Sequence, residues 1–159
     1  MLVLAIDSSS STATCALVSE KGVLGEINLN DKKQHSVLLM DLIDDLLKYN
    51  NLKIKDLDGF AISEGPGSFT GLRIGMATVK GLSFGSKKPS VCVSSLDALA
   101  YNISGFNGII CPIIDALRGN VYASLYKKEG DELVSLSEKE CISLTDLIEK
   151  IKEKNEDVI

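Results

Sequence analysis

Apolar residues occur in the first third of the chain as three short runs followed by one helical stripe. Residues 2–6 form a continuous apolar run, which is typical of a strand buried on both faces. Residues 15–18 and 23–29 predict two further strands, so the chain should open with a three-stranded meander. Residues 34–50 then carry apolar positions every three to four residues, and we expect a helix that packs on this sheet.

The remaining residues continue to alternate between strands and helices. The predicted strands cover residues 57–62, 91–93, 109–114, 121–126 and 133–136. The predicted helices run from residue 70 to 85, from Ser94 or Ser95 to Ala100, and onward from Ser143 or Thr145. This alternation predicts an α/β protein with a mixed sheet and flanking helices. Val158 and Ile159 look like the start of another strand, so we expect the chain to be a fragment.

The most distinctive stretch is SEGPGSFTGLRIG at residues 63–75, where a strand passes through a turn into a helix. Gly65 and Gly67 can adopt a positive φ and Pro66 fixes its own φ, which together predict a sharp, stiff turn. Ser68 or Thr70 can cap the helix that follows.

Two functional interpretations of this stretch stay open at this point. The helix N-terminus would favour an anion, but the spacing is not that of a phosphate-binding P-loop and Arg73 is the only nearby cation, so a structural turn is favoured. Gly71, Gly75 and Thr78 place small residues along one helix face. Either the chain's own sheet or a helix of another chain must approach that face closely.

Composition and charge exclude several classes of function. The net charge of −5 over 159 residues disfavours autonomous nucleic-acid binding, and no apolar run has the ~20 residues that a membrane span needs. The four cysteines form no CxxC pair and His35 is the only histidine, so no metal site is expected. We expect reduced, mostly buried cysteines and, since no signal-peptide pattern opens the chain, a cytoplasmic location.

An internal repeat indicates a duplicated architecture. IDSSSSTATCALVSEKG and IDALRGNVYASLYKKEG align without a gap, so that Asp7 matches Asp115 and Gly22 matches Gly130. The expected fold is that of the actin, sugar-kinase and Hsp70 proteins, a ribonuclease H-like plan. We predict an N-terminal lobe at residues 1–104 and the start of an incomplete second lobe at residues 105–159.

In that plan the turn after the first strand of each lobe binds the phosphates of a nucleotide and the metal ion that accompanies them. The candidate residues for such vestigial phosphate turns are Asp7, Ser8, Ser9 and Asp115. An aspartate at the end of a strand is equally a good turn residue, and this second interpretation stays open.

The motifs together resemble the bacterial TsaB family, also called YeaZ. The similarity rests on SEGPGSFTGLRIG, on VSSLDALA at residues 93–100, on IDALRGNVY at residues 114–122, on the AIDSSS start and on QHSVLL. It covers nearly the whole chain. Val37 and Met40 depart from the family pattern, where Glu and Pro are usual, and the family's C-terminal segment is absent.

This resemblance implies a non-catalytic scaffold subunit in the threonylcarbamoyl modification of adenosine 37 of tRNAs. Its partners would be TsaD, a catalytic relative, and the small ATPase TsaE, with a homodimer when it is alone and tRNA contact only through the complex. ATP and a metal ion are expected on the partner subunits. The chain itself would bind no cofactor tightly and no metal, since His35 has no partner for the HxxxH pair of the catalytic relative.

The same resemblance implies an interface on the two N-terminal helices, over residues 34–50 and 70–85. Its candidate residues are His35, Leu39, Leu42, Ile43, Leu46, Thr70, Gly71, Ile74, Gly75, Thr78 and Leu82. The motif turn adds Gly65, Pro66, Gly67, Ser68 and Arg73.

Two enzymatic alternatives compete with the scaffold hypothesis. The first is a self-sufficient nucleotide-dependent enzyme that uses Asp7 and Asp115. The second is a serine hydrolase built on His35, which the missing GxSxG motif disfavours.

Overall fold

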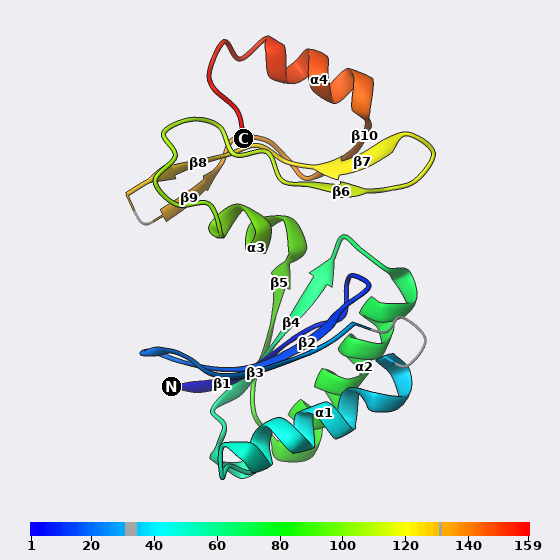
Figure 1. Cartoon of the computed structure of the whole chain (residues 1–159), viewed down its shortest axis with the longest axis vertical. Coiled ribbons are helices and arrows are strands. Elements are labelled where there is room, and N and C mark those ends of the chain that lie inside the picture. Colours follow the sequence, from blue (N-terminus) through cyan, green and yellow to red (C-terminus); the bar gives the residue numbers. More distant parts are fainter. Residues whose placement is uncertain (31–34, 131) are drawn as a thin grey trace. The chain divides into compact units, whose positions relative to one another are not determined.

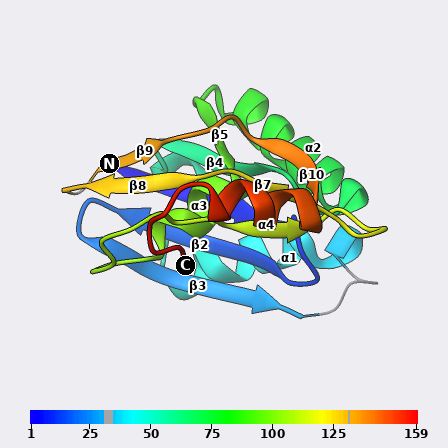
Figure 2. The ribbon, with the colours of Figure 1, turned by 90° about the horizontal axis from the view of Figure 1, so that it is seen from above.

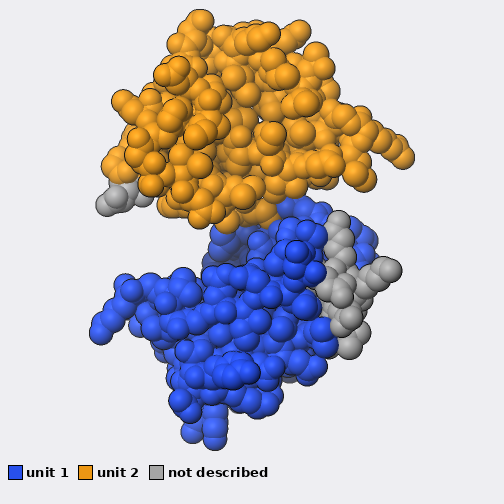
Figure 3. Space-filling model, viewed as in Figure 1, with its two compact units in different colours: residues 1–93 blue, residues 94–159 orange. Residues whose placement is uncertain are grey.

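The computed structural model describes residues 1–30, 35–130 and 132–159, and of residues 35–37 only the backbone. The chain forms two compact units, residues 1–93 and 94–159 (Figure 3). Ala100 shares a buried cluster with Ile110 and Tyr126, which groups the helix that carries Ala100 with the second unit. The division into lobes after residue 104 stays a prediction.

The first unit contains a five-stranded mixed sheet in the order β3-β2-β1-β4-β5 (Figure 1). Its strands are β1 (Leu2–Asp7), β2 (Ala13–Ser19), β3 (Gly22–Leu29), β4 (Gly59–Gly65) and β5 (Ser90–Ser94). β1 pairs antiparallel with β2 and parallel with β4, and β2 pairs antiparallel with β3. The predicted opening meander is therefore confirmed, and β1 lies in the middle of the sheet.

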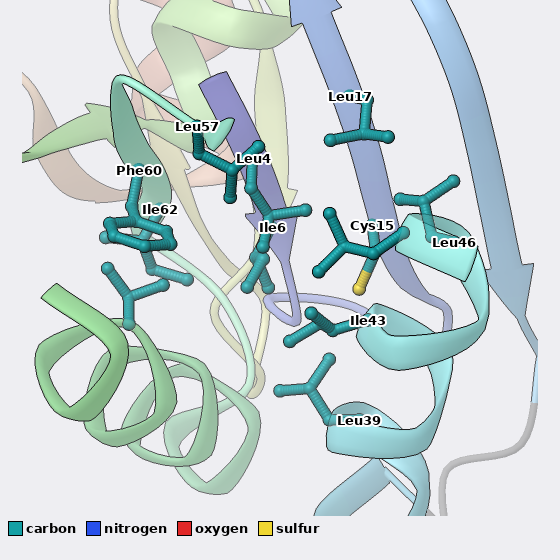
Figure 4. Packing of buried hydrophobic residues seen from close by; sticks show 12 residues of the cluster. Leu4, Ile6, Cys15, Leu17, Leu39, Ile43, Leu46, Leu57, Phe60 and Ile62 are labelled. Atoms are coloured by element: carbon teal, nitrogen blue, oxygen red, sulfur yellow. The ribbon is translucent and has the colours of Figure 1, made fainter. Parts of the chain in front are cut away.

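Two helices cover one face of this sheet. They are α1 (His35–Tyr49) and α2 (Phe69–Ser86), and the short 3₁₀ helix η1 (Ile54–Asp56) precedes β4. One continuous core joins the apolar sides of both helices to the sheet (Figure 4). Its buried members are Leu4, Ile6, Cys15, Leu17, Leu39, Ile43, Leu46, Leu47, Leu57, Phe60, Ile62 and Val79.

The second unit begins with α3 (Ser95–Tyr101) and contains two small sheets. β6 (Ile113–Asp115), β7 (Asn120–Ala123) and β10 (Glu140–Ser143) form one sheet in the order β10-β7-β6. β8 (Tyr126–Glu129) and β9 (Glu132–Ser135) form a hairpin. The last helix, α4 (Leu144–Lys152), packs on β7, and Leu147 of the helix is buried there against Val121 and Ala123 of the strand (Figure 2).

Several local expectations for the second unit are wrong. The strand expected at residues 109–114 is regular only from Ile113, and Ile109 and Ile110 form isolated bridges to Val158 and Tyr126. The strand expected at residues 121–126 is divided into β7 and β8, because the Ser137 side chain accepts the backbone N–H of Leu125 there at 3.0 Å.

The predictions for the helix N-caps and for the burial of the cysteines are confirmed only in part. Ser143 caps α4 as expected, by accepting the N–H of Asp146 at 3.1 Å. Ser94 precedes α3 but its buried hydroxyl makes no hydrogen bond among the described residues. Cys15 is buried, whereas Cys92 and Cys141 are exposed, which corrects the expectation of mostly buried cysteines.

Candidate functional site

The Gly-Pro-Gly turn is fastened to the turn that follows β1. Gly65 has φ +100°, the Gly65–Pro66 peptide is cis, and the N–H of Ser68 donates to the carbonyl oxygen of Ser9 at 2.6 Å. A Cβ on Gly67 would lie 2.4 Å from that same carbonyl oxygen, so only glycine fits there. Ser68 caps α2 by accepting the N–H of Gly71 at 3.3 Å.

Gly71 and Gly75 face the chain's own β1–β2 turn. A Cβ on Gly71 would lie 2.0 Å from the carbonyl oxygen of Ser8, and a Cβ on Gly75 would lie 2.3 Å from the Ser8 hydroxyl and 2.9 Å from Ile62 Cδ1. Both glycines are buried. This answers the question left open by the sequence: the close approach is made by the turn after β1 and, at Gly75, also by Ile62 of β4. The expectation that these two glycines offer a face to another chain is corrected accordingly.

The candidate phosphate turn of the first unit makes the hydrogen bonds of an Asx turn. The Asp7 carboxylate accepts the N–H of Ser9 at 2.7 Å, and the buried Ser8 hydroxyl donates to the carbonyl oxygen of Gly71 at 2.8 Å. The Ser8 contact connects the turn after β1 to α2, the Asp7 contact stays within that turn, and neither needs a ligand. A role in nucleotide binding stays a prediction.

The matching turn of the second unit repeats this arrangement. The Asp115 carboxylate accepts the N–H of Leu117 at 2.8 Å, again two residues on. Both aspartates end a strand that pairs antiparallel with the next strand, and Gly22 and Gly130 both have a positive φ. The repeat seen in the sequence thus corresponds to a structural repeat.

The residues expected at a partner interface divide into buried and accessible groups. Leu39, Ile43 and Leu46 are at most 2% exposed and belong to the core of the first unit. The accessible members are Leu42, Thr70, Ile74, Thr78 and Leu82, which are exposed or half-buried. The side chain of His35 and the whole of Gln34 lie outside the described part of the chain.

The outer side of α2 carries a surface that the sequence analysis largely missed. Arg73 was assigned only to the motif turn, but together with Phe69, Leu72, Met76, Ala77 and Lys80 it lines an open hollow of about 440 Å³. We call these six residues the basic hollow. Phe69 is 74% exposed, and the Arg73 guanidinium lies 5.2 Å from the centre of its ring. Their spacing of three to four residues was the signal that could have revealed it.

The outer side of α1 is acidic. Asp41, Asp44 and Asp45 are all exposed, and we call them the acidic edge. Asp44 forms an ion pair with Lys48 at 2.5 Å. This hydrogen-bonded carboxylate raises the pKa of Lys48, and the charges of Asp45 and Asp41 add to the same effect.

Neither a metal site nor a membrane-spanning helix is found among the described residues. No group of three or more His, Cys, Asp or Glu side chains in the described ranges could hold a metal ion. Across the same residues, no helix has the length and apolar character that crossing a membrane requires.

Comparison with known proteins defines the class first. The activator of 2-hydroxyisocaproyl-CoA dehydratase from Clostridium difficile superimposes with a TM-score of 0.52 at 14% identity, over 96% of this chain and 53% of that chain. This likeness shows the fold alone. A putative N-acetylmannosamine kinase from Listeria monocytogenes has a TM-score of 0.50 at 16% identity, over 84% of this chain and 49% of that chain. The α/β fold is thus the actin-like and sugar-kinase-like fold that the mixed sheet and the repeated turns indicated.

Closer similarity identifies the family within this class. The family model described as "TsaD: tRNA N6-adenosine threonylcarbamoyltransferase" matches residues 21–157. The tRNA threonylcarbamoyladenosine biosynthesis protein TsaB of Bacillus subtilis is 39% identical over 159 residues, which are 100% of this chain and 69% of that protein. The structure of YeaZ from Pseudomonas aeruginosa has a TM-score of 0.79 at 28% identity and covers 89% of this chain and 67% of that chain.

The chain belongs to the TsaB (YeaZ) family, which confirms the resemblance noted in its sequence. It spans about two thirds of the length of these relatives.

Proposed function

We propose that the chain is a non-catalytic subunit in the biosynthesis of threonylcarbamoyladenosine in tRNA, and that it docks on TsaD through α1 and α2. Support for the process comes from the name of the 39% identical relative and from the matching family model. TsaE completes the proposed set of partners, and tRNA is reached only through the complex. ATP and a metal ion belong to the partner subunits.

The observation that carries the proposal is the accessible outer side of the helix pair. α2 presents the exposed ring of Phe69 beside half-buried Leu72 and Met76, and α1 presents exposed Met40. Aromatic residues, Met and Arg are the types enriched at protein interfaces. By contrast, Asp7 and Asp115 each accept a backbone N–H within their own turns, which is the arrangement of a structural residue.

The docking experiment compares two exposed phenylalanines of the same helix. Phe69 lines the basic hollow, whereas Phe84 is 89% exposed near the other end of α2 and lies outside it. We expect Phe69→Ser to weaken capture by TsaD about tenfold or more, the loss typical of an aromatic anchor, and Phe84→Ser to leave capture unchanged. Circular dichroism of both variants should match the unchanged chain, since neither ring belongs to the core. Undiminished capture of a folded Phe69→Ser variant would overturn the proposed interface.

Reconstitution tests the catalytic assignment separately. TsaD and TsaE with tRNA, ATP, magnesium and a threonylcarbamoyl donor are assayed for threonylcarbamoyladenosine with and without this chain, used at the length in which it occurs in the cell. We expect formation of the modified base to depend on the chain. Unchanged formation without it, or calorimetric binding of magnesium and ATP to the chain alone with a Kd below about 0.1 mM, would favour the independent nucleotide-dependent enzyme instead.

A further inference from the structure

The second unit has a hollow of its own, whose walls come from α3, β8, β9 and residues 136–139. Its volume is about 740 Å³, which lies within the range of small-molecule sites. All of its lining residues belong to residues 94–159, so it is formed by one compact unit. We call it the α3 hollow, because Asp97 and Tyr101, one helical turn apart on α3, form one of its walls.

The Asp97 carboxylate is the main hydrogen-bond acceptor in the α3 hollow. Its Oδ1 accepts a hydrogen bond from the Tyr126 hydroxyl at 2.6 Å, and its Oδ2 accepts one from the Lys139 ammonium at 2.7 Å. Burial, followed by the bond to Asp97, raises the pKa of Tyr126 to about 12, so this hydroxyl remains a donor at neutral pH. The Asp97 side chain is still 34% exposed, and each carboxylate oxygen can accept a second hydrogen bond. A ligand can therefore also donate to this carboxylate.

Lys139 indicates which ligand group suits this carboxylate. Its ammonium reaches Asp97 from 42 positions further along the chain, and from a segment that is neither helix nor strand. Asp97 is thus placed to receive a primary ammonium group. The Lys139 side chain is exposed, and exposed ion pairs contribute little to stability. A ligand ammonium can consequently take the place of the Lys139 ammonium at little cost.

The other walls of the α3 hollow favour a cation that carries an apolar body. The exposed carboxylate of Glu138 also lines the hollow, so two carboxylates face the single ammonium of Lys139. The exposed side chains of Tyr101 and Leu136 provide aromatic and apolar surface in the same hollow. An aromatic ring attracts a cation through its negative face, in addition to the attraction of the carboxylates. The lining therefore selects a cation over an anion.

We propose that the α3 hollow binds a primary ammonium group on an apolar or aromatic body, and that this group donates to Asp97 in the position that the Lys139 ammonium occupies. The body of the ligand lies on Tyr101 and Leu136. Two sources carry this chemistry, namely a free small amine and a lysine side chain of another protein chain. The α3 hollow contains no residue of α1 or α2, so this proposal is independent of the proposed function.

Titration with phenethylamine tests the proposal, followed by NMR spectroscopy of the isotope-labelled chain at the length in which it occurs in the cell. We expect the backbone amide signals of α3 and residues 136–139 to shift with a Kd of about 1 mM or below. Phenethyl alcohol, the neutral analogue, should bind at least about tenfold more weakly, because it cannot form the charge-assisted hydrogen bond. The absence of saturable shifts with the amine, or equal affinity for the alcohol, would overturn the proposal.

Two ion-paired lysines provide a matched pair of variants. Lys139→Met removes the competing ammonium and keeps a long side chain, so phenethylamine should bind about two- to fivefold more tightly, the equivalent of one exposed ion pair. Lys127 is likewise ion-paired, to Glu156 at 2.7 Å, but does not line the hollow, so Lys127→Met should leave the Kd unchanged. Affinity for the amine that Lys139→Met leaves unchanged or lowers would contradict the proposed position of the ammonium.

A variant of Asp97 measures the contribution of the carboxylate itself. Asp97→Asn keeps an oxygen that can accept the Tyr126 hydroxyl but removes the charge, and we expect it to weaken phenethylamine binding at least about tenfold. The thermal midpoint shows whether this variant is folded. If it is unfolded, the two lysine variants still decide the question, because both lysine side chains are partly exposed.

Two further ligands distinguish the source of the ammonium and the sign of its charge. Tighter binding of a capped lysine amide than of phenethylamine would assign the hollow to a lysine of another chain, and the reverse order would assign it to a free amine. Hydrocinnamate, the anionic analogue, should bind more weakly than either. If hydrocinnamate instead bound most tightly, and lost its affinity in Lys139→Met, the hollow would be an anion site and the proposal would be wrong.

Discussion

The Ser8 hydroxyl donates a hydrogen bond to the carbonyl oxygen of Gly71 across 2.8 Å, while the Ser8 carbonyl oxygen occupies the place that a Cβ at position 71 would need. The two residues are 63 positions apart in sequence. Their contact seats the first turn of α2 directly on the turn after β1. The glycines of the GPGSFTGLRIG stretch thus serve the internal packing of the first unit.

Replacing Gly75 should destabilise the protein, and replacing Gly81 should not. An added Cβ at position 75 meets Ser8 and Ile62, so we expect Gly75→Ala to cost about 1–3 kcal/mol by overpacking. Nothing lies within 4 Å of an added Cβ at Gly81, so Gly81→Ala should gain up to about 1 kcal/mol from helix propensity. Urea unfolding followed by circular dichroism measures both. Equal stabilities would contradict this account of α2.

A larger residue at position 75 is consequently a poor probe of partner binding. Gly75→Arg places a long side chain against the buried Ser8 and Ile62, and we expect it to lower the thermal midpoint of the protein itself. If that variant failed to bind its partner, the failure could be explained by misfolding of the variant and would give no information about the interface. Phe69→Ser avoids this confusion because the ring is exposed.

The N-cap of α2 can be assigned by a pair of alanine substitutions. Ser68 accepts the N–H of Gly71, so Ser68→Ala should cost about 1 kcal/mol. Thr70, the other candidate from the sequence, is exposed inside the helix, so Thr70→Ala should change stability by less than about 0.5 kcal/mol. The free energies of unfolding in urea decide between them, and a larger loss at position 70 would refute the observed cap.

Alkaline pH should destabilise the first unit through Cys15. Burial raises the pKa of the Cys15 thiol from 9.0 to about 12. The folded state therefore keeps the proton more tightly, so this contribution to stability is present below pH 9 and is lost as the pH rises toward about 12. The thermal midpoint of the unchanged chain should fall relative to that of Cys15→Val over this range. A constant difference between the two proteins would show that folding does not change the pKa of Cys15.

The second unit offers a comparable test at Tyr126. Its hydroxyl donates to the Asp97 carboxylate at 2.6 Å, and burial, followed by this hydrogen bond, raises the pKa of Tyr126 to about 12. Tyr126→Phe leaves the ring in the core but removes the bond, at a cost of about 0.5–1.5 kcal/mol. Tyr101→Phe is the matched control, since Tyr101 is exposed. Differential scanning calorimetry should show the lower midpoint only for Tyr126→Phe.

The elements of the first unit could be predicted because each carries its own local pattern. β1, β2 and β3 appear where apolar runs and a turn at Gly22 indicate them, and α1 begins and ends within one residue of the expected helix. β10 was missed, because its short segment pairs with β7, whose residues are about twenty positions earlier. Pairings with distant segments leave little trace in a local pattern.

The candidate interface shows why periodicity alone could not locate a binding surface. Leu39, Ile43 and Leu46 recur at helical spacing because they face the chain's own sheet, and this is the commonest cause of such a stripe. A row of glycines on one helix face likewise indicates that another element packs closely against that face, but it does not identify that element. The accessible residues, such as Phe69 and Lys80, became visible only once the buried side of α2 was known.

The central place of β1 bears on the order in which the chain can fold during its synthesis. β1 is made first and finds its antiparallel neighbour β2 almost at once, but its parallel neighbour β4 emerges from the ribosome only after the whole of α1. Until then one edge of β1 carries unpaired N–H and C=O groups beside the apolar side chains of Leu4 and Ile6. The nascent meander therefore exposes an unpaired strand edge, of the kind that favours aggregation, until β4 pairs with β1.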